Sequence, residues 1–254
     1  MKNTIQRLLY RINLHRLLPD RHNQVIMYHS IGGGNYANIG TDRFRGDVEY
    51  FVQNYEIVDL PQILTTGDTK QIALTFDDGY KDFKKNVVPI LDGFEIPATV
   101  FVVTDPIFRP DKPVRDTNIS DQSIHMGRAD VAELVDNDRV HIGNHTKSHP
   151  QLTRCSDEEL QNEIVDAKRE LENEFGITVN RFCYPHGDFD SRVASIVSGT
   201  HDYAVKATGS NKFLPADIDP MAIPRIDGSN ELWKTRWQVS DSYQYLRSFH
   251  QKLP

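Results

Sequence analysis

Short apolar runs rich in β-branched residues alternate with helical patterns along most of this chain. Such alternation is typical of βαβ units, which place strands side by side in a largely parallel sheet. The order predicts one barrel-like α/β domain from about residue 21 to about residue 240. In α/β barrels, functional residues gather at the carboxyl ends of the strands. The predicted strands are residues 24–28, 56–60, 71–76, 98–103, 140–143, 181–184, 203–207 and 221–226.

Helix signals lie between these strands. Thr41 is predicted to cap one helix, and Ser156 with Glu159 has the pattern of a capping box that opens another. Gly176 is predicted to end that second helix. Residues 104–126 have weak periodicity and contain prolines, so we expect a long loop that covers or borders a site. Shorter helices are expected at residues 129–135 and from about 190 to 198.

The charge of the chain argues against one class of partner. Its 254 residues carry a formal net charge of -7. A nucleic acid recognised through its phosphates is therefore not an expected partner. No apolar stretch is long enough to span a bilayer. The two cysteines, Cys155 and Cys183, form no CxxC pair and no disulfide framework, which predicts reduced thiols and fits a cytoplasmic setting.

Residues 1–20 form a separate basic segment in which Lys2, Arg7, Arg11 and Arg16 are interleaved with leucine and isoleucine. The segment lacks the unbroken apolar region and the small-residue cleavage site of a signal peptide. It could form an amphipathic helix that lies on an anionic membrane surface. The alternatives are a helix that packs its apolar face on the domain, or a loose leader. The expected localisation is cytoplasmic, with membrane association under the first of these readings.

Two adjacent carboxylates, Asp77 and Asp78, follow the predicted strand 71–76 and precede Gly79. Neighbouring strand residues point to opposite faces, but a glycine after the strand lets the backbone turn and bring both side chains into one pocket. One carboxylate could then hold a metal while the other takes a proton from water. The alternative is a simple turn capped by an aspartate.

Two histidines four residues apart, His145 and His149, follow the predicted strand 140–143. Their spacing places two imidazoles on one side of a helical turn, which Pro150 keeps short. An aspartate with two histidines leaves coordination positions open for water and substrate, as a catalytic metal needs. The sequence therefore predicts metal-assisted hydrolysis. The alternative is a pair of solvated or capping histidines.

A third element is the turn Tyr184-Pro185-His186-Gly187, which ends the predicted strand 181–184. Backbone N–H groups in a tight turn at a strand end can bind a developing oxyanion.

These three elements, in this order, resemble the motifs of the polysaccharide deacetylase family, the NodB-homology carbohydrate esterases, in the branch with a Tyr-Pro-x-Gly motif. Thr75-Phe76-Asp77-Asp78-Gly79 is similar to the first motif and residues 145–149 to the second. Residues 25–30 and 224–226 resemble the first and last strands of that branch. The resemblance spans about residues 24 to 226 within a deacetylase domain assigned to residues 21–254. It implies a distorted (β/α) barrel that removes acetyl groups from N-acetylated sugars.

The resemblance also implies roles for individual residues. Asp77 is the expected catalytic base. The divalent metal, expected to be zinc with cobalt or nickel as substitutes, is held by Asp78, His145 and His149. The expected substrate is an acetylated amino-sugar glycan or a glycan precursor; the oligomeric state stays open. The expected substrate and oxyanion contacts are Tyr184, Pro185, His186, Gly187 and Arg225.

Two departures from the family pattern leave roles open. The family's main branch has an arginine in the third motif that steadies the base, and Cys183 stands at about that place here. Arg181, on the same strand face, or Arg225, from another strand, could replace it. The Leu-x-His motif that supplies the general acid is also missing. His29 is the candidate acid, because it ends the first strand at the same mouth, and His186 is the alternative.

These departures keep two other functions open. One is a carbohydrate-binding homologue with impaired catalysis. The other is a deformylase or deacylase of a lipid-linked sugar, which the basic segment at residues 1–20 favours.

Overall fold

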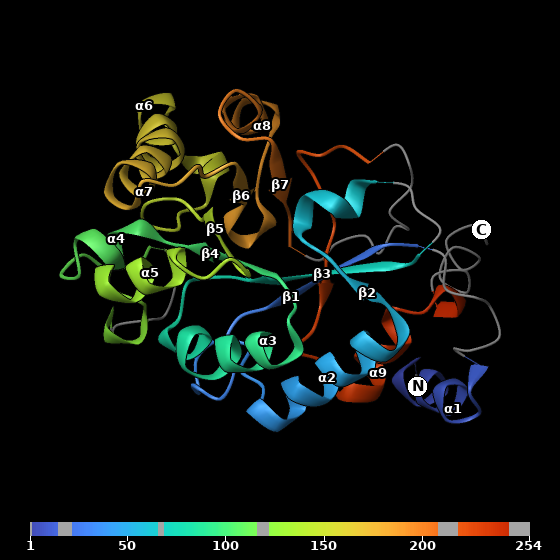
Figure 1. The fold of residues 1–254 in the computed structure, drawn as a ribbon. Helices are drawn as coiled ribbons and strands as arrows, with labels where there is room; N and C mark the ends of the chain where they lie inside the picture. The colour runs from blue at the N-terminus through green and yellow to red at the C-terminus, as the bar shows by residue number, and fades with distance from the viewer. Residues whose placement is uncertain (1, 15–21, 66–68, 116–121, 208–217, 244–254) are drawn as a thin grey trace.

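The computed structural model describes residues 2–14, 22–65, 69–115, 122–207 and 218–243. Eight strands form one curled sheet in the order β7-β6-β5-β4-β3-β1-β8, with β2 paired to β3 (Figure 1). Every strand pair is parallel. The strands are β1 (Gln24–Tyr28), β2 (Glu56–Ile57), β3 (Gln71–Phe76), β4 (Ala98–Val102), β5 (Val140–Asn144), β6 (Arg181–Cys183), β7 (Tyr203–Val205) and β8 (Ile226–Asp227).

The central strands β1, β3 and β4 are buried along their whole length. Parallel strands covered on both faces carry continuous apolar runs, which is why the sequence predicted their bounds well. The expected strand at 221–226 is wrong in extent, because β8 begins only at Ile226. Pro224 lacks the N–H that a regular ladder needs, so the residues before β8 are limited to a single bridge between Ile223 and Val205.

The segment 223–226 joins the two ends of the sheet. Ile223 pairs with Val205 at the end of β7, and Ile226 pairs with Ile26 of β1. The chain therefore crosses from one edge strand to the other and curls the sheet toward closure. This arrangement confirms the predicted distorted (β/α) barrel, and it carries Arg225 across the interior.

Helices cover the outer face of the sheet (Figure 1). The capping box of Ser156 and Glu159 and the left-handed end at Gly176 are confirmed. The residue before the second helix along the chain is Gly40, which makes no side-chain cap, so Thr41 is the first helical residue rather than the cap. The α-helices are α1 (Lys2–Arg11), α2 (Thr41–Asn54), α3 (Val88–Phe94), α4 (Thr104–Phe108), α5 (Arg128–Val135), α6 (Asp157–Leu160), α7 (Ala167–Phe175), α8 (Ser191–Ser198) and α9 (Leu232–Gln238).

Several turns of other helical types complete the chain. The expected loop at 104–126 is wrong at its start, where the chain forms α4. Pro106 lies in the first turn of this helix, a position that tolerates a residue without an N–H. Residues 116–121 of the expected loop lie outside the described residues. Two π-helical segments interrupt or precede α-helices. The 3-10 and π segments are η2 (Leu60–Leu64), η3 (Phe83–Val87), η4 (Gln122–Ile124), η5 (Leu152–Arg154), η6 (Gln161–Asp166) and η7 (Pro185–Gly187).

Strand alternation separates two apolar clusters. Ile72, Leu74 and Phe76 of β3 join the larger cluster between the sheet and its helices. Ala73 joins a smaller cluster inside the barrel, together with Phe101 and other inward residues. Because alternate residues of a strand share a face, Thr75 and Asp77 continue the inward row that begins at Ala73. The acidic end of β3 is thereby aimed at the barrel interior.

Candidate active site

The carboxyl ends of neighbouring parallel strands bring the predicted motifs together. Asp77 follows β3, His145 follows β5, and Tyr184 follows β6. His29 comes directly after β1, while Arg225 enters from the crossing segment before β8. Residues from distant parts of the sequence therefore meet at one mouth of the barrel, as the fold class predicts.

A left-handed turn after β3 sets the two carboxylates. Asp78 has φ 71° and Gly79 has φ 69°. A Cβ on Gly79 would stand 3.1 Å from Cγ1 of Val102 and 3.3 Å from its Cα, so the position suits glycine on both conformational and steric grounds. This turn frees Asp78 from the strand's alternation and lets both carboxylates face the mouth, as the sequence predicted.

Asp78, His145 and His149 form a compact group of candidate metal ligands. Oδ1 of Asp78 lies 3.5 Å from Nε2 of His145 and 3.6 Å from Nε2 of His149. Zinc ligands at their usual bond lengths in a tetrahedral site stand about 3.3 Å apart. The donor set, its spacing and its open fourth side therefore fit a divalent metal of the zinc type.

Hydrogen bonds and burial fix the two imidazoles. Nδ1 of His145 lies 2.8 Å from the carbonyl oxygen of Cys183, which leaves Nε2 directed at Asp78. A ring nitrogen held by a carbonyl is the usual device that orients a ligating histidine. The ring of His149 stands edge-on to His145 at 4.7 Å and to His186 at 4.6 Å between centroids. Within the described part of the chain, the buried Nδ1 of His149 has no hydrogen-bond partner.

The expected short helix at His145 and His149 is wrong. Thr146 and His149 have φ values of 67° and 62°, in the left-handed region where a β-branched residue is rare. A bent loop, not a helical turn, therefore brings the two imidazoles to one ligand group. Left-handed non-glycine residues at a site are a form of strain that the surrounding structure must hold in place.

Two buried polar side chains brace this loop. Asn144 accepts a hydrogen bond from the N–H of Thr146 and donates one to the carbonyl of Ile164. The carboxylate of Glu163 accepts the N–H groups of Lys147 and Ser148 and the hydroxyl of Ser148.

Sequence reasoning missed both braces. The one available signal was that Glu163 stands three residues after Leu160 and four before Ala167, so it carries a charge on an otherwise apolar helix face. It lies in η6, and π segments of this kind frequently occur at functional sites.

Arg225 holds Asp77 from across the barrel. Its Nη1 donates to Oδ1 of Asp77 at 2.6 Å and its Nη2 to Oδ2 at 2.7 Å. Nε of Arg225 also donates to the carbonyl of Lys206, so the guanidinium is fixed in the plane of the carboxylate. Burial alone would raise the pKa of Asp77, but the Arg225 guanidinium, helped by His145 and His29, holds that pKa below its usual range.

Arg181, the other candidate for this role, lies elsewhere. Arg181 is the first residue of β6, and its guanidinium pairs with the carboxylate of Asp59. Oδ2 of Asp59 also lies 3.4 Å from Nε2 of His141. Arg181 and Cys183 do share a strand face, but Arg181 is at the opposite end of the short strand from the mouth. The expectation that Arg181 steadies the base is therefore wrong, and Arg225 occupies that position. Arg225 was expected among the substrate contacts, and its buried guanidinium is instead engaged by Asp77.

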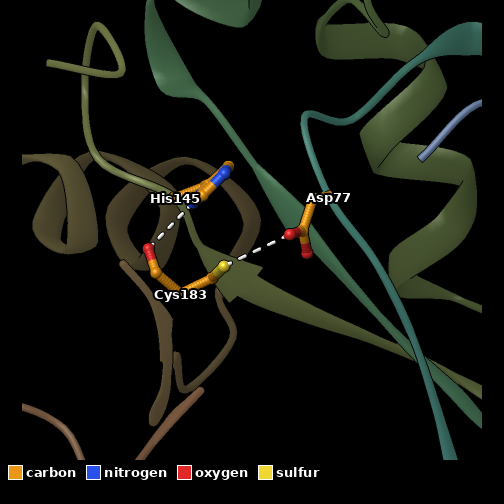
Figure 2. A group of neighbouring side chains, drawn as sticks. All are labelled: Asp77, His145 and Cys183. Atoms are coloured by element: carbon orange, nitrogen blue, oxygen red, sulfur yellow. Dashed lines mark hydrogen bonds between the residues drawn. The ribbon is translucent and has the colours of Figure 1, made fainter. Parts of the chain in front are cut away.

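Cys183 lies beside Asp77, one partner of this ion pair (Figure 2). Its thiol donates to Oδ2 of Asp77 at 3.5 Å and accepts from Nη2 of Arg225 at 3.2 Å. Asp77, His145 and Cys183 also form a cluster of possible ligand atoms. Arg225 already engages two of its three members, so Asp78, His145 and His149 are the better-suited ligand set. Burial raises the pKa of the Cys183 thiol, which keeps it protonated at neutral pH.

Two of the three candidate ligands, Asp78 and His149, have the charge states that metal binding needs. Burial would raise the pKa of Asp78, but the hydrogen bond from His145 and the charges of His29 and His149 bring it well below its usual range. Burial and the neighbouring His145 lower the pKa of His149 to about 3. At pH 7, Asp78 is thus ionised and His149 is neutral, the forms in which both ligate metals. Burial would lower the pKa of His145, but Cys183 and Asp78 raise it well above its ordinary value, so a metal bound there would displace a proton.

His29 and the Tyr184–Gly187 turn complete the mouth. Nε2 of His29 lies 3.9 Å from Oδ2 of Asp77, and its ring stands edge-on to Tyr36. In the turn, His186 has φ 58° and Gly187 has φ 70°. The N–H of Tyr184 donates to the carbonyl of Val205, and the N–H of Gly187 donates to the carbonyl of Tyr184. The ring of His186 faces His149 across the opening.

Comparisons with known proteins agree with this site. The family model for polysaccharide deacetylases matches residues 65–203, which contain both carboxylates, both ligand histidines and the 184–187 turn. The Bacillus subtilis protein YxkH, which carries the same family name, is 24% identical over 219 residues, covering 84% of this chain and 70% of its own. A chitooligosaccharide deacetylase from Bradyrhizobium sp. is 32% identical over 104 residues, covering 41% of this chain and 39% of its own.

A solved structure extends the likeness to the fold. The Streptococcus pyogenes deacetylase PplD, determined in complex with acetate, superposes with a TM-score of 0.69 over 87% of this chain and 98% of its own, at 18% sequence identity. At that identity the likeness concerns the barrel alone. Since the family model matches more than half of the sequence, the chain belongs to the polysaccharide deacetylase family.

Proposed function

We propose that this protein is a metal-dependent hydrolase that removes N-acetyl groups from an amino-sugar glycan or glycan precursor. The observation that carries the proposal is the pairing of a carboxylate held by Arg225, Asp77, with a three-ligand group built on the next residue, Asp78. The chitooligosaccharide deacetylase among the relatives supports an N-acetylated sugar as the substrate class.

Asp78, His145 and His149 would hold the metal. A divalent ion of the zinc type, with cobalt or nickel as substitutes, supplies a Lewis acid that polarises the acetyl carbonyl and makes water more acidic. Residues around the candidate ligands fix the orientation of the two histidines. The carbonyl of Cys183 orients the ring of His145, and the hydroxyl of Thr146 accepts the N–H of His149. Such supporting contacts set ligand orientation and thereby affinity.

Asp77 would act as the general base. Its ionised form is favoured by Arg225, and one proton moves from the attacking water to a carboxylate oxygen as the new C–O bond forms at the acetyl carbon. The acetyl oxygen then carries the negative charge. The N–H groups of Tyr184 and Gly187 are already engaged and Pro185 has none, so the N–H of His186 is the candidate donor to that oxygen.

His29 would act as the general acid. Its Nε2 lies 3.9 Å from Asp77, so both groups can reach opposite sides of one reacting acetamide. As the C–N bond breaks, the leaving amine takes a proton from His29, and acetate and the free amino sugar are released. His186 stays the alternative acid, because it stands at the same opening but on the far side of His149.

Acetate release from N-acetylglucosamine oligomers tests the proposal. The full chain is stripped of metal, then assayed alone and with zinc or cobalt. Metal-dependent release is expected, and Asp77→Asn should lower kcat by about 10²- to 10⁴-fold while the metal still binds. Asp136→Asn, an exposed aspartate at the end of α5, is the matched control and should leave kcat unchanged. Release at the wild-type rate by Asp77→Asn would refute the mechanism; no release despite bound metal would favour a binding homologue or another acyl group.

A further inference from the structure

The first helix of the structure presents an exposed apolar stripe. Ile5, Leu8 and Ile12 are 56%, 59% and 62% exposed. The hydrogen bond from the N–H of Ile12 to the carbonyl of Leu8 continues the helical pattern just past α1. The spacings of three and four residues therefore place all three side chains on one face. In the described part of the chain, the other exposed large apolar side chains are Tyr36 and Val52, each alone on a different segment.

The opposite face of α1 is attached to the domain. Tyr10, on the face opposite the stripe, stands with its ring 6.3 Å from Trp233 of α9. Figure 1 shows α1 beside α9 at the edge of the molecule. The helix is thus held by one side, and its apolar stripe points away from the core that could have covered it. An apolar stripe that folding leaves uncovered marks a surface for a partner.

Charge indicates which partner fits this stripe. Arg7 and Arg11 are exposed and lie four residues apart on one side of α1, and Arg11 is three residues after Leu8 at the border of the stripe. Neither has an acidic partner among the described residues. The first 19 residues contain four cations, Lys2, Arg7, Arg11 and Arg16, and no acidic residue, whereas the whole chain has a net charge of -7. The remainder of the chain is net acidic, so this basic edge is the part of the described structure that we expect an anionic bilayer to attract.

We propose that α1 docks this protein on an anionic lipid surface. The helix lies in the plane of the interface, with Ile5, Leu8 and Ile12 at the boundary of headgroups and acyl chains. Arg7 and Arg11 contact the anionic headgroups beside them. None of the described helices combines the length and apolar character needed to cross a bilayer. The attachment is therefore peripheral, reversible and weakened by salt.

Vesicle flotation of the full chain tests this docking. The protein should float with vesicles of phosphatidylglycerol and phosphatidylcholine, and much less with phosphatidylcholine alone or at 1 M salt. Leu8→Gln with Ile12→Gln should weaken binding by about 100-fold, because each removed apolar side chain accounts for about tenfold. Arg7→Gln with Arg11→Gln should weaken it by about fivefold per arginine.

Matched controls keep the test specific. Val52→Gln removes an exposed apolar side chain from α2, and Arg45→Gln with Lys112→Gln removes two exposed cations outside α1. Both controls should float like the wild type. All variants should keep the wild-type thermal midpoint and the wild-type rate on a soluble oligosaccharide, so lost flotation would not reflect misfolding or failed catalysis.

Three results would overturn the proposal. The first is the absence of flotation with anionic vesicles, and the second is equal flotation of the α1 variants and the wild type. The third is a wild-type dimer in light scattering that Leu8→Gln with Ile12→Gln converts to a monomer, since the stripe would then belong to a second copy of the chain. Each result concerns the edge formed by α1, and none depends on whether the protein hydrolyses acetamides.

Discussion

Arg225 and Asp77 are 148 positions apart in the chain, yet both Nη atoms of the arginine meet both oxygens of the aspartate at 2.6 and 2.7 Å. A bidentate pair of this kind fixes the plane of the carboxylate as well as its charge. Because the pair is buried, removal of either partner would leave an uncompensated charge, at a cost of about 3–5 kcal/mol.

Arg225→Lys is expected to lower kcat by about 100-fold and to leave the metal stoichiometry unchanged. A lysine keeps the positive charge, but it cannot hold two oxygens in one plane, so Asp77 loses its fixed orientation toward water. The measurement is steady-state acetate release together with metal content by atomic absorption. The control is Arg181→Lys. Arg181 pairs with Asp59 and not with Asp77, so this variant should keep the wild-type kcat. Full activity in Arg225→Lys would contradict the positioning role.

Cys183→Ser is expected to retain most activity, whereas Cys183→Val should lower kcat by about tenfold. Serine keeps a donor toward Asp77 and an acceptor for Arg225, whereas valine is apolar, slightly larger than cysteine, and removes both hydrogen bonds. Thermal unfolding of both variants would separate this effect from a packing defect. Equal rates for serine and valine would show that the thiol only fills space.

Glu163→Gln should weaken metal binding by about 10- to 100-fold, although it leaves the candidate ligands Asp78, His145 and His149 in place. The carboxylate accepts three hydrogen bonds from Lys147 and Ser148, and an amide can accept fewer and must also place its own donor in a buried site. Competition with a chromogenic chelator for zinc would measure the affinity. Glu159→Gln, an exposed helix cap, is the control. An unchanged zinc affinity in Glu163→Gln would count against the bracing role.

His201 makes stability depend on pH. Burial, with a smaller effect of Lys168, lowers its pKa to about 3. Between its ordinary pKa near 6.5 and pH 3, the unfolded chain binds a proton at His201 that the folded chain does not bind. The contribution of His201 to the free energy of unfolding is therefore complete above pH 6.5. As the pH decreases below 6.5, this contribution decreases by up to about 1.4 kcal/mol per pH unit.

Urea unfolding at several pH values between 4 and 7 would measure this slope. In the folded protein, the amide nitrogen of Asn144 donates to the unprotonated Nε2 of His201. His201→Gln supplies a neutral acceptor, so we expect the slope of unfolding free energy against pH to become flatter. A variant with the wild-type slope would show that other groups dominate the acid sensitivity.

The sequence allowed good predictions where a local pattern determines the structure. The strands β1 and β3 were predicted with their observed bounds, because strands buried on both faces give continuous apolar runs. The turn at Asp78 and Gly79 was also predicted, since a glycine after a strand directly indicates a left-handed position. The family resemblance rested on these same residues and is confirmed by the family model.

Other features depend on tertiary contacts and could not be predicted. The left-handed residues Thr146 and His149 contradict local preference. The loop between them is held by Glu163, 15 positions after Ser148, which accepts the N–H groups of Lys147 and Ser148, while Thr146 donates to Asn144 and His149 donates to Thr146. The choice between Arg181 and Arg225 depended on which end of a three-residue strand faces the mouth. The period of apolar residues does not indicate which arginine reaches Asp77, and only the assembled sheet shows it.

The crossing segment before β8 has a consequence for the order in which the protein becomes competent. The candidate metal ligands and the proposed base are synthesised well before Arg225, which arrives with the last strand of the barrel. Until that strand docks, Asp77 has no fixed counter-charge and the barrel interior is open on one side. Under the proposed mechanism, a nascent or prematurely ended chain would therefore carry the whole candidate ligand set without an oriented base, and hydrolysis would begin only when the barrel closes.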